Sequence, residues 1–475
     1  MLLSELVKNW PCTVRGSVGI EVEGITEHSC SVKENYVFVA RKGAHADGFL
    51  HVDEAISRGA VAIILDRNIP AGYVRKKGVT WITVPDGRQF ISHASANLAG
   101  NPSDSLTVIA VTGTNGKTTV THFIAQLLRL HGEKAAVIGT TGIFMNDYKI
   151  HCSVPEMTTL PADYLHPLLK DCLNAGMSYV VMEASSLGLS SGRLDHCTID
   201  IGVFLNIGID HYEEHGSKEA YIEAKKKLAT LANRLIVNAD DLQCVSLVGK
   251  TSKQLEFYNM NMIQGKTILP ENYPNLPGKH NRSNAFAAVS VLTMLGYDLK
   301  ETLVLSRQLE LPEGRLQRIS KDDLTVYVDY AHTPDALQTI LLSLIEENEG
   351  TTITTVFGCG GNRDRSKRPQ MGEVAATCSS KVIITSDNPR NEDPLFIIND
   401  ILKGTIFHME KVSIEPDRKK AIQKAIAEAT EGEIILIAGK GHEKTQQIGS
   451  TQHHFCDIEV AKQCLDDKIF GIRTE

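Results

Sequence analysis

The chain has 475 residues, a formal net charge of −8 at pH 7, 42% hydrophobic residues and 22% charged residues. This composition is typical of a globular protein rather than a disordered or fibrous one, and its length favours about three domains. The acidic balance argues against a dominant nucleic-acid partner, because binding a phosphate backbone usually needs a basic face.

The N-terminal residues 1–6 lack the basic segment and apolar run of a signal peptide. No stretch approaches the ~20 apolar residues that span a bilayer. Ten cysteines are scattered between Cys12 and Cys464 without a CxxC pair, which favours buried free thiols over a disulfide scaffold or a zinc site. We therefore expect a cytoplasmic protein without membrane insertion.

Residues 1–100 contain short apolar runs bounded by Gly and Asp, such as 36–40 and 60–65. These runs are typical of strands in a small α/β domain. The Gly-Asn-Pro-Ser stretch at 100–103 favours a turn and is the first candidate linker.

A second segment opens with an expected strand at 106–111, a glycine-containing turn and a helix over 118–131 that Gly132 would end. Three later apolar runs are bounded like buried parallel strands, at 179–182, 201–205 and 235–237. This alternation predicts a nucleotide-binding α/β core.

A third α/β segment begins near residue 311, with strands expected at 324–328, 352–357, 382–385 and 434–438. Thr333 and Asp393 each place a capping side chain before a proline, and Asp417 would cap a helix running to about residue 429. Alternating strands and helices predict a parallel sheet with right-handed crossovers.

The motif Gly113-Thr114-Asn115-Gly116-Lys117-Thr118-Thr119 lies between a predicted strand and a predicted helix. In this context glycines let backbone N–H groups surround phosphate oxygens at a helix N-terminus. Lys117 would neutralise the β- and γ-phosphates, and the Thr118 hydroxyl would reach Mg²⁺. The usual GxxxxGK spacing is not met, because Val111 stands at its first glycine. An ordinary helix-capping turn is the alternative.

The expected fold is thus α/β with three domains. They are a small N-terminal α/β domain over 1–100, a central P-loop ATPase-like parallel sheet over 101–310, and a C-terminal Rossmann-like domain over 311–475.

Polar side chains follow two of the predicted central strands. Glu183 comes after the run at 179–182, and His211 lies in a polar stretch after the run at 201–205. Polar groups at strand ends are often functional in open α/β sheets. Alone, Glu183 is equally well a capping or surface carboxylate, and a lone histidine is more often structural. Beside a phosphate loop, both are suitable donors for Mg²⁺.

Lys225, Lys226 and Lys227 form a run on a predicted helix. From physical chemistry alone, such a run is normally a solvated helix face.

The variant loop GTNGKTT resembles that of the Mur ligase family, which includes the folylpolyglutamate synthetases, and the resemblance covers nearly the whole chain. It implies ATP and Mg²⁺ as cofactors. Glu183 and His211 then match metal-binding positions. Lys225 matches the lysine of the family's AKxxL segment, which is carbamylated and thereby becomes an anionic oxygen ligand. The implied catalytic set is Lys117, Glu183, His211 and carbamylated Lys225, with Thr118 as a further metal ligand. Lys226 and Lys227 keep the solvated interpretation.

The resemblance also assigns other substrate contacts. Further ATP-binding positions are His280, Asn281, Asn284, Arg315, Asp329 and His332. Positions that match contacts to a UDP-linked precursor are Ser29, Thr158, Thr159, Ser185, Ser191 and Arg193. Cys30 replaces the family's usual arginine, and Met157, Leu187 and Ser191 replace residues that are commonly polar in relatives, so the sequence departs from the family mainly in this pocket.

Asp387-Asn388-Pro389-Arg390 follows a predicted strand and resembles the DNPR motif of the family members that add diaminopimelate. Diaminopimelate differs from lysine by a distal carboxylate, which a guanidinium can hold bidentately. Arg363, Gly439 and Glu443 match other contacts to this amino acid, with Glu443 pairing with its distal ammonium. A lone DNPR segment is also compatible with a simple turn.

The resemblance therefore implies an ATP-dependent ligase of peptidoglycan biosynthesis. It would add meso-diaminopimelate to the D-glutamate of UDP-N-acetylmuramoyl-L-alanyl-D-glutamate through an acyl phosphate, acting as a monomer on small molecules. An L-lysine-adding ligase and a folylpolyglutamate synthetase are alternatives that residues 387–390 and the extra N-terminal domain disfavour. A non-catalytic nucleotide-binding regulator stays open because precursor-site residues are substituted.

Overall fold

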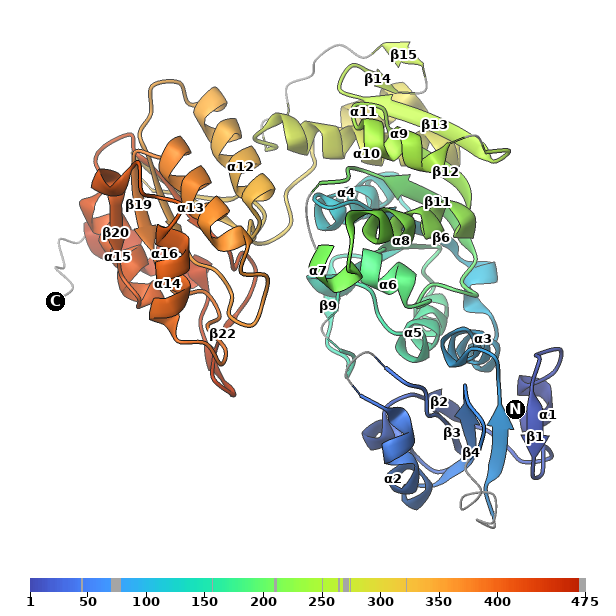
Figure 1. The fold of residues 1–475 in the computed structure, drawn as a ribbon. Coiled ribbons are helices and arrows are strands. Elements are labelled where there is room, and N and C mark those ends of the chain that lie inside the picture. Colours follow the sequence, from blue (N-terminus) through green and yellow to red (C-terminus); the bar gives the residue numbers. More distant parts are fainter. Residues whose placement is uncertain are drawn as a thin grey trace. The chain divides into compact units, whose positions relative to one another are not determined.

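A computed structural model describes residues 1–43, 46–69, 78–155, 157–208, 212–249, 251–263, 265–267, 273, 275–321 and 323–469. Their strands form sheets of five, ten and six strands and a two-stranded hairpin (Figure 1). The chain divides into two compact units. The first comprises Met1–Gly113, Ile124–Asn206 and Glu219–Phe257, and the second comprises Thr114–Phe123, Ile207–Lys218 and Tyr258–Glu475.

The N-terminal sheet has the order β1-β5-β4-β3-β2, with β1 antiparallel to β5 and the other neighbours parallel. Successive side chains of a strand face opposite sides of the sheet. On β4, Ile64 therefore packs in one cluster with helices α1 and α3, while Ile63 packs in another with α2. The elements are α1 Leu3–Leu6, β1 Thr13–Arg15, β2 Gly24–Thr26, η1 Ser29–Ser31, β3 Tyr36–Val39, η2 Gly48–His51, α2 Val52–Ser57, β4 Ala60–Leu65, β5 Thr80–Thr83 and α3 Gly87–Ala99.

The central sheet has the order β15-β14-β13-β12-β11-β6-β10-β7-β8-β9, and its core from β12 to β7 is parallel. Strand β6 lies between β10 and β11, so the chain after β6 emerges beside the ends of both neighbours. The first part comprises η3 Pro102–Ser105, β6 Thr107–Thr112, α4 Lys117–Leu130, β7 Ala135–Gly139, β8 Gly142–Met145, β9 Tyr148–Ile150, α5 Ala162–Asn174, β10 Tyr179–Glu183, α6 Ser186–Ser190 and β11 Ile199–Phe204. The rest comprises α7 Tyr212–His215, α8 Lys218–Leu231, β12 Ala232–Asn238, α9 Leu242–Val248, β13 Gln254–Asn259, β14 Met262–Ile263, β15 Lys266–Thr267, α10 Lys279–Leu295 and α11 Leu299–Ser306.

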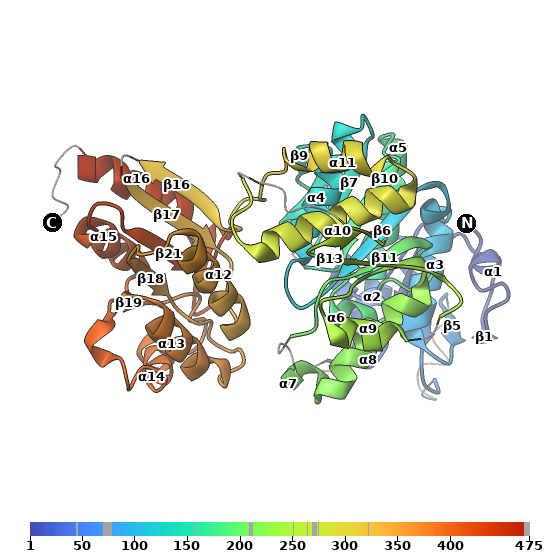
Figure 2. The same cartoon turned by 90° about the horizontal axis from the view of Figure 1, so that it is seen from above.

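The C-terminal sheet has the order β16-β17-β21-β18-β19-β20, parallel except for β16. Alternating residues of β21 pack on opposite faces, Leu436 with α12, α13 and α14, and Ile435 with α15 and α16 (Figure 2). The elements are β16 Gln317–Lys321, β17 Leu324–Asp329, α12 Pro334–Glu347, β18 Ile353–Phe357, α13 Lys367–Cys378, β19 Lys381–Ile384, α14 Pro394–Leu402, η4 Met409–Lys411, β20 Val412–Ile414, α15 Arg418–Glu428, β21 Ile434–Ala438, β22 Thr445–Ile448, β23 Thr451–His454 and α16 Asp457–Ile469.

The α/β class and the predicted helix starts are confirmed. The side chains of Thr333, Asp393 and Asp417 each accept a backbone N–H at the start of α12, α14 and α15. The expected linker at 100–103 is instead a packed connection: Pro102 and Ser103 are buried in η3, and Ser103 Oγ accepts the N–H of Thr198.

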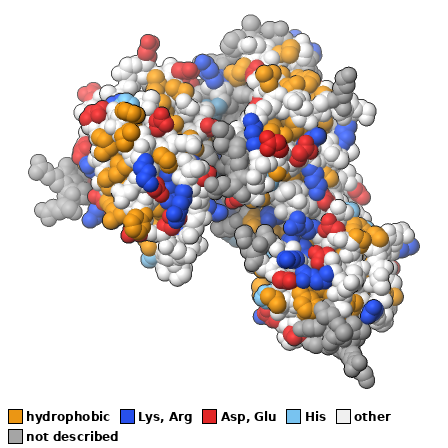
Figure 3. Space-filling model, in the orientation of Figure 1, with side chains coloured by type: hydrophobic (Ala, Val, Ile, Leu, Met, Phe, Trp, Pro, Cys, Tyr) orange, Lys and Arg blue, Asp and Glu red, His pale blue; other side chains and the backbone are white. Residues whose placement is uncertain are grey.

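The ten cysteines are free, as predicted, but Cys30 and Cys152 are exposed rather than buried. Among the described residues no helix is long and apolar enough to cross a membrane. On the face shown in Figure 3, Lys and Arg side chains are interspersed with Asp and Glu, and that face carries no dominant basic surface.

Candidate active site

The predicted phosphate loop joins the carboxyl end of β6 to the first turn of α4. Gly116 has a φ of +87°, a conformation that favours glycine. The Lys117 ammonium donates to the Thr114 carbonyl at 3.0 Å, so the lysine folds back over the loop. Thr114 and Gly208 are also joined, because the Gly208 N–H donates to the Thr114 hydroxyl at 2.8 Å. Thr118 and Thr119 are buried just inside the helix, and Gly113 and Asn115 complete the loop.

Glu183 ends strand β10 and is buried, in register with Val111 on β6. Its Oε1 accepts the Thr140 N–H at 2.8 Å and its Oε2 accepts the Thr140 hydroxyl at 3.2 Å. A Cβ at Gly139 would lie only 2.3 Å from Oε1, so the carboxylate occupies space that only a glycine leaves open. Thr140 therefore holds the Glu183 carboxylate in one orientation.

The predicted precursor residues Thr158, Thr159 and Ser185 join the same hydroxyl network. The Thr159 hydroxyl donates to the Glu183 carbonyl at 2.8 Å, accepts the Ser185 N–H at 2.9 Å and lies 3.0 Å from Ser185 Oγ. The Thr140 hydroxyl contacts that of Thr158 at 3.1 Å. Ser185 in turn caps α6 through the Gly188 N–H.

Arg193 joins this group, whereas Ser29 makes a separate contact. The Arg193 guanidinium donates to the Thr159 carbonyl at 2.6 Å, and burial lowers its pKa. Ser191 follows α6 as its C-terminal cap. The Ser29 hydroxyl donates to Glu54 on α2 at 2.7 Å. The described residues therefore bring together the predicted precursor contacts of 158–193 but hold Ser29 in another local network.

Lys225 is buried, with 2% of its surface exposed, and its Nζ lies 4.8 Å from the centre of the Tyr221 ring. The solvated-face interpretation is thus wrong for Lys225. It holds for Lys226, which is about half exposed and pairs with Glu223. Lys227 is neither buried like Lys225 nor freely solvated, because its ammonium forms a 2.8 Å ion pair with Asp195. In general, burial disfavours a charged ammonium and so favours the neutral amine, which is the form that can react with CO₂.

His211 lies outside the described residues. Among those that are described, no group of three or more His, Cys, Asp or Glu side chains is placed to hold a metal ion. The predicted metal ligands among the described residues are therefore Glu183, Thr118 and Lys225. Of these, only Glu183 carries a carboxylate in the unmodified chain.

The predicted adenine segment opens helix α10. Asn281 and Asn284 are buried, and the Asn281 amide donates to the Pro277 carbonyl at 2.7 Å. His280 Nδ1 lies 3.2 Å from Ser343 Oγ on α12, and burial lowers the pKa of His280 to about 4. The ring is therefore neutral near pH 7.

The predicted ATP contacts near 315–332 form one turn-rich cluster. The Asp329 carboxylate accepts the Leu316 and Ala331 N–H groups, each at 2.6 Å. Burial raises the pKa of Asp329, and the Arg315 charge opposes that shift. Within the second unit, Arg315 donates to the Thr118 hydroxyl at 3.0 Å and lies 4.7 Å from the Tyr330 ring centre. His332 Nδ1 lies 3.0 Å from the Tyr330 carbonyl oxygen.

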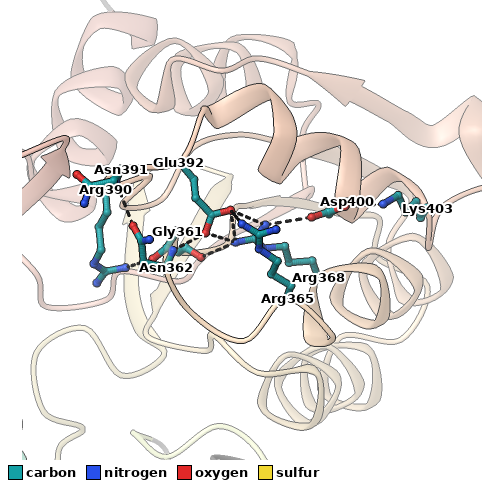
Figure 4. A network of polar contacts seen from close by, with 10 residues as sticks. Gly361, Asn362, Arg365, Arg368, Arg390, Asn391, Glu392, Asp400 and Lys403 are labelled. Carbon is teal, nitrogen blue, oxygen red and sulfur yellow. Dashed lines mark hydrogen bonds and ion pairs between the residues drawn. The ribbon is translucent and has the colours of Figure 1, made fainter. Parts of the chain in front are cut away.

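The predicted amino-acid segment follows β19 and contacts the loop after β18. The Arg390 guanidinium donates to the Gly361 carbonyl at 2.9 Å (Figure 4). A Cβ at Gly361 would lie 1.9 Å from the Pro389 oxygen, so this approach requires glycine. Arg390 itself has a φ of +51°, and its backbone is fixed by hydrogen bonds with Gln447 and Gly449 of the β22–β23 hairpin. These hydrogen bonds fix the backbone position from which the Arg390 side chain extends.

Asn388, in the same segment as Arg390, contacts Glu443. The Asn388 amide donates to Glu443 Oε2 at 2.9 Å. Gly439, with a φ of +116°, leaves room for Asp387, whose Oδ2 would lie 2.7 Å from a Cβ there. Arg363 belongs to the loop that contacts Arg390, but its side chain is over half exposed, at 58%, and lies 4.0 Å from Glu214. The structure thus clusters Asp387, Asn388, Pro389, Arg390, Gly439 and Glu443, with Arg363 at the rim.

The sequence patterns did not predict the buried ion pairs that lie near these residues. Arg368 is fully buried and donates to both oxygens of Glu392 and to Asp400, while Glu392 accepts the Asn362 N–H (Figure 4). The Arg368 guanidinium holds the pKa of the Glu392 carboxyl below its usual value. Arg418 forms a second buried pair with Asp457 and donates to the Ala438 carbonyl. Their partners lie far along the sequence, so no local pattern indicates them.

Comparisons with known proteins identify the family. Residues 111–292 match the Mur ligase middle domain, and residues 314–441 match the Mur ligase, glutamate ligase domain. UDP-N-acetylmuramoyl-L-alanyl-D-glutamate–2,6-diaminopimelate ligase 2 of Clostridium acetobutylicum is 35% identical over 98% of this chain and 100% of its own. The corresponding ligase of Bacteroides thetaiotaomicron is 36% identical over 98% and 100%.

Solved structures agree. A structure of a UDP-N-acetylmuramoyl-L-alanyl-D-glutamate–2,6-diaminopimelate ligase has a TM-score of 0.68 and 30% identity, with 99% of both chains covered. A folylpolyglutamate synthase of Mycobacterium tuberculosis shares only the fold, with a TM-score of 0.60 and 15% identity over 81% of this chain and 95% of its own. The predicted three-domain fold is thus confirmed, and the chain belongs to the Mur ligase family.

Proposed function

We propose that the chain is an ATP-dependent ligase that joins meso-2,6-diaminopimelate to the D-glutamate γ-carboxyl of UDP-N-acetylmuramoyl-L-alanyl-D-glutamate, in peptidoglycan biosynthesis. The observation that carries the proposal is the cluster in which the Arg390 guanidinium donates to the Gly361 carbonyl and Asn388, two residues earlier, donates to Glu443. A guanidinium and a carboxylate connected through the same segment, 387–390, suit an amino acid whose distal end bears both a carboxylate and an ammonium. Relatives that bear the name of this ligase match the chain end to end, which supports the assignment.

The proposed reaction moves the γ-phosphoryl group of ATP to the D-glutamate γ-carboxylate, and the diaminopimelate amine then displaces phosphate to form the amide. Lys117 and the backbone N–H groups of 113–119 would bind the phosphates at the start of α4. Arg315, His280, Asn281, Asn284, Asp329 and His332 would bind the rest of ATP. The hydroxyls of Thr158, Thr159 and Ser185, with Arg193, Ser191 and Ser29, would bind the precursor.

Mg²⁺, when bound, would neutralise charge on the phosphates. Thr118, Glu183 and His211 would hold it. Glu183 fits this role because it is a buried carboxylate whose two oxygens are held in one orientation by Thr140, and carboxylate oxygens are ligands that Mg²⁺ prefers. The ammonium of Lys225 would repel a cation, so Lys225 fits only once it is carbamylated.

The proposal assigns precursor binding to residues 1–100, ATP binding to 101–310 and amino-acid binding to 311–475. We further propose that the ligase acts as a cytoplasmic monomer. The remaining candidates are an L-lysine-adding ligase, a folylpolyglutamate synthetase and a nucleotide-binding regulator without turnover.

One assay separates these functions: phosphate release measured with ATP, the UDP-dipeptide and a panel of amino acids. We expect release to require both the UDP-dipeptide and meso-diaminopimelate, with L-lysine far poorer because it would leave Arg390 desolvated and unpaired. Arg390→Ala should lower kcat/KM for meso-diaminopimelate by about ten- to a hundredfold, since a charge-assisted contact is lost. It should leave the low value for L-lysine nearly unchanged.

Comparable kcat/KM values for the two amino acids in the wild type would refute the assigned amino acid. Phosphate release without any amino acid would refute the ligase reaction, and release with a folate substrate instead of the UDP-dipeptide would favour the synthetase.

A further inference from the structure

Lys440 is a buried cation that contacts Asn388 and Glu443, and neither the motifs nor the family resemblance gives it a role. It lies between Gly439 and Gly441 in the turn after β21, and its side chain has no exposed surface. Its Nζ donates to Glu443 Oε2 at 2.8 Å and to Asn388 Oδ1 at 3.2 Å. Because Asn388 also donates to Glu443 Oε2 at 2.9 Å, the three side chains close a triangle of hydrogen bonds.

The triangle fixes how Asn388 is turned. Its Oδ1 accepts from Lys440 and from the Gln447 N–H at 2.9 Å, and its Nδ2 donates to Glu443. A flipped amide would face two donors with its own N–H groups and lose these bonds. The cation and the β22 backbone together therefore determine the orientation of this amide.

The same contacts fix how Glu443 is presented. Its Oε2 accepts from both Lys440 and Asn388, and its backbone N–H donates to the Lys440 carbonyl at 3.0 Å. The Glu443 side chain is still 31% exposed, while that of Lys440 is not exposed at all. One oxygen is thus tied into the protein, which leaves Oε1 as the oxygen that can face a ligand.

We infer that Lys440 is a positioning residue that anchors Glu443 and Asn388 so that Glu443 Oε1 receives the distal ammonium of the incoming amino acid. This inference rests on the proposed function and adds a residue to it. A long carboxylate side chain that is free to rotate would lose rotamer freedom on binding, and an anchored one has already lost it on folding. Anchoring Glu443 therefore strengthens the binding of ligands that carry the distal ammonium.

That selectivity supplies the test. 2-Aminopimelate has the distal carboxylate of diaminopimelate but no distal ammonium, so it does not use Glu443 Oε1. Both amino acids would be measured as substrates, and 2-aminopimelate also as a competitive inhibitor of meso-diaminopimelate. We expect Lys440→Met to lower kcat/KM for meso-diaminopimelate by about ten- to a hundredfold, mainly through KM. The kinetic or inhibition constant for 2-aminopimelate should change by less than about threefold.

Removing one partner of a buried ion pair can prevent folding, so the thermal midpoint and circular dichroism are recorded for each variant. Lys440→Gln keeps an amide donor and gives a second folded variant, for which a smaller but equally selective loss is expected. The matched control is Lys444→Met, because Lys444 lies in the same loop, its side chain is 58% exposed and its ammonium forms a 3.9 Å ion pair with Glu313. It should leave both constants unchanged.

An equal loss for both amino acids in a folded variant would make Lys440 merely structural and overturn the inference. No loss for either would do the same. Wild-type protein that releases no phosphate with meso-diaminopimelate would instead refute the proposed function, so the two failures are distinguishable.

Discussion

The Glu183 network and the Arg390 pocket both fix a charged side chain, but they use different chemistry. Around Glu183, Thr140 donates its N–H and its hydroxyl to the carboxylate, and the Thr159 hydroxyl, which accepts the Ser185 N–H, donates to the Glu183 carbonyl. Around Arg390 the supports are buried ions, Arg368 with Glu392 and Lys440 with Glu443. Both arrangements hold side chains in one orientation. They differ in how much stability is lost when one of the supporting side chains is removed.

The difference has a physical consequence. Loss of a neutral hydroxyl leaves a partner that can still be satisfied by water or another donor, at a cost of about 1–2 kcal/mol. Loss of one buried ion leaves an uncompensated charge, at a cost of about 3–5 kcal/mol. The hydroxyls and the N–H group that contact Glu183 orient it without adding charge. Buried ion pairs instead make the geometry of the residues around Arg390 hard to change one residue at a time.

The largest expected effect tests whether the phosphate loop carries the chemistry while the Arg390 pocket carries the choice of amino acid. Lys117→Ala should reduce phosphate release by about a thousandfold or more, equally for every amino acid, because charge on the transferred group is no longer neutralised. The thermal midpoint should stay near that of wild type, since Lys117 is only partly buried. Near-normal turnover would refute the ATP-site assignment, and exposed Lys170→Ala is the control.

The second prediction compares the two networks through stability. Arg368→Met should destabilise the protein by about 3–5 kcal/mol, because Glu392 and Asp400 lose their buried cation. Thr140→Val, which removes one hydroxyl from Glu183, should cost only about 1–2 kcal/mol. Thermal unfolding of both variants measures the difference.

Arg365→Met is the matched control for Arg368. Arg365 pairs with the same Glu392 at 3.1 Å, but its side chain is 70% exposed (Figure 4), so its loss should cost less than about 1 kcal/mol. Equal shifts for Arg365→Met and Arg368→Met would remove the distinction between a buried and a surface ion pair on which the comparison rests.

Local sequence signals predicted the scaffold of both regions but only part of their support. Strand β21 occupies the predicted residues, and Glu183 stands at the predicted strand end. Such features depend on periodicity and capping within a few residues. The pair of Arg368 with Glu392 and that of Arg418 with Asp457 join residues 24 and 39 positions apart. They depend on how elements pack, which no local pattern encodes.

Lys225 is the instructive error, because the sequence did hold a signal for its burial. The buried residues of α8 are Tyr221, Ala224, Lys225 and Leu228. This spacing is that of one helical stripe, and it places Lys225 on the apolar face while Lys226 points away. Residue type predicted exposure, and helical periodicity, given more weight, would have predicted burial.

The third prediction concerns the buried lysine. If Lys225 is carbamylated, Lys225→Ala should lower phosphate release by about a hundredfold, and a short carboxylic acid should restore part of it by occupying the vacated space. Mass spectrometry of the intact protein under CO₂ would detect the added group. Lys226→Ala, on the exposed face, should change neither. Full activity of Lys225→Ala would rule out a catalytic carbamate.

The smallest expected effect concerns His166, a neutral buried group in the same compact unit as Glu183. His166 lies on α5 with no exposed surface, and burial, helped by the charge of His196, lowers its pKa to about 4. The unfolded histidine titrates near pH 6.5. Below that pH the unfolded chain binds a proton that the folded chain does not. The contribution to stability is therefore complete above about pH 6.5 and is lost as the pH falls towards 4.

The loss amounts to about 1.4 kcal/mol per pH unit in that window. Hydrogen exchange of α5 amides, corrected for intrinsic rates, would measure it locally, which is preferable because a chain of several domains need not unfold in one step. Between pH 7.5 and 5.5 the opening free energy of α5 should fall by about 1.4 kcal/mol more in wild type than in His166→Leu. Whatever the leucine costs at pH 7.5 cancels, because only the change with pH is compared. Parallel pH profiles for the two proteins would show that His166 is already protonated or solvated in the folded state. The pH dependence of the α5 opening free energy would then not arise from His166.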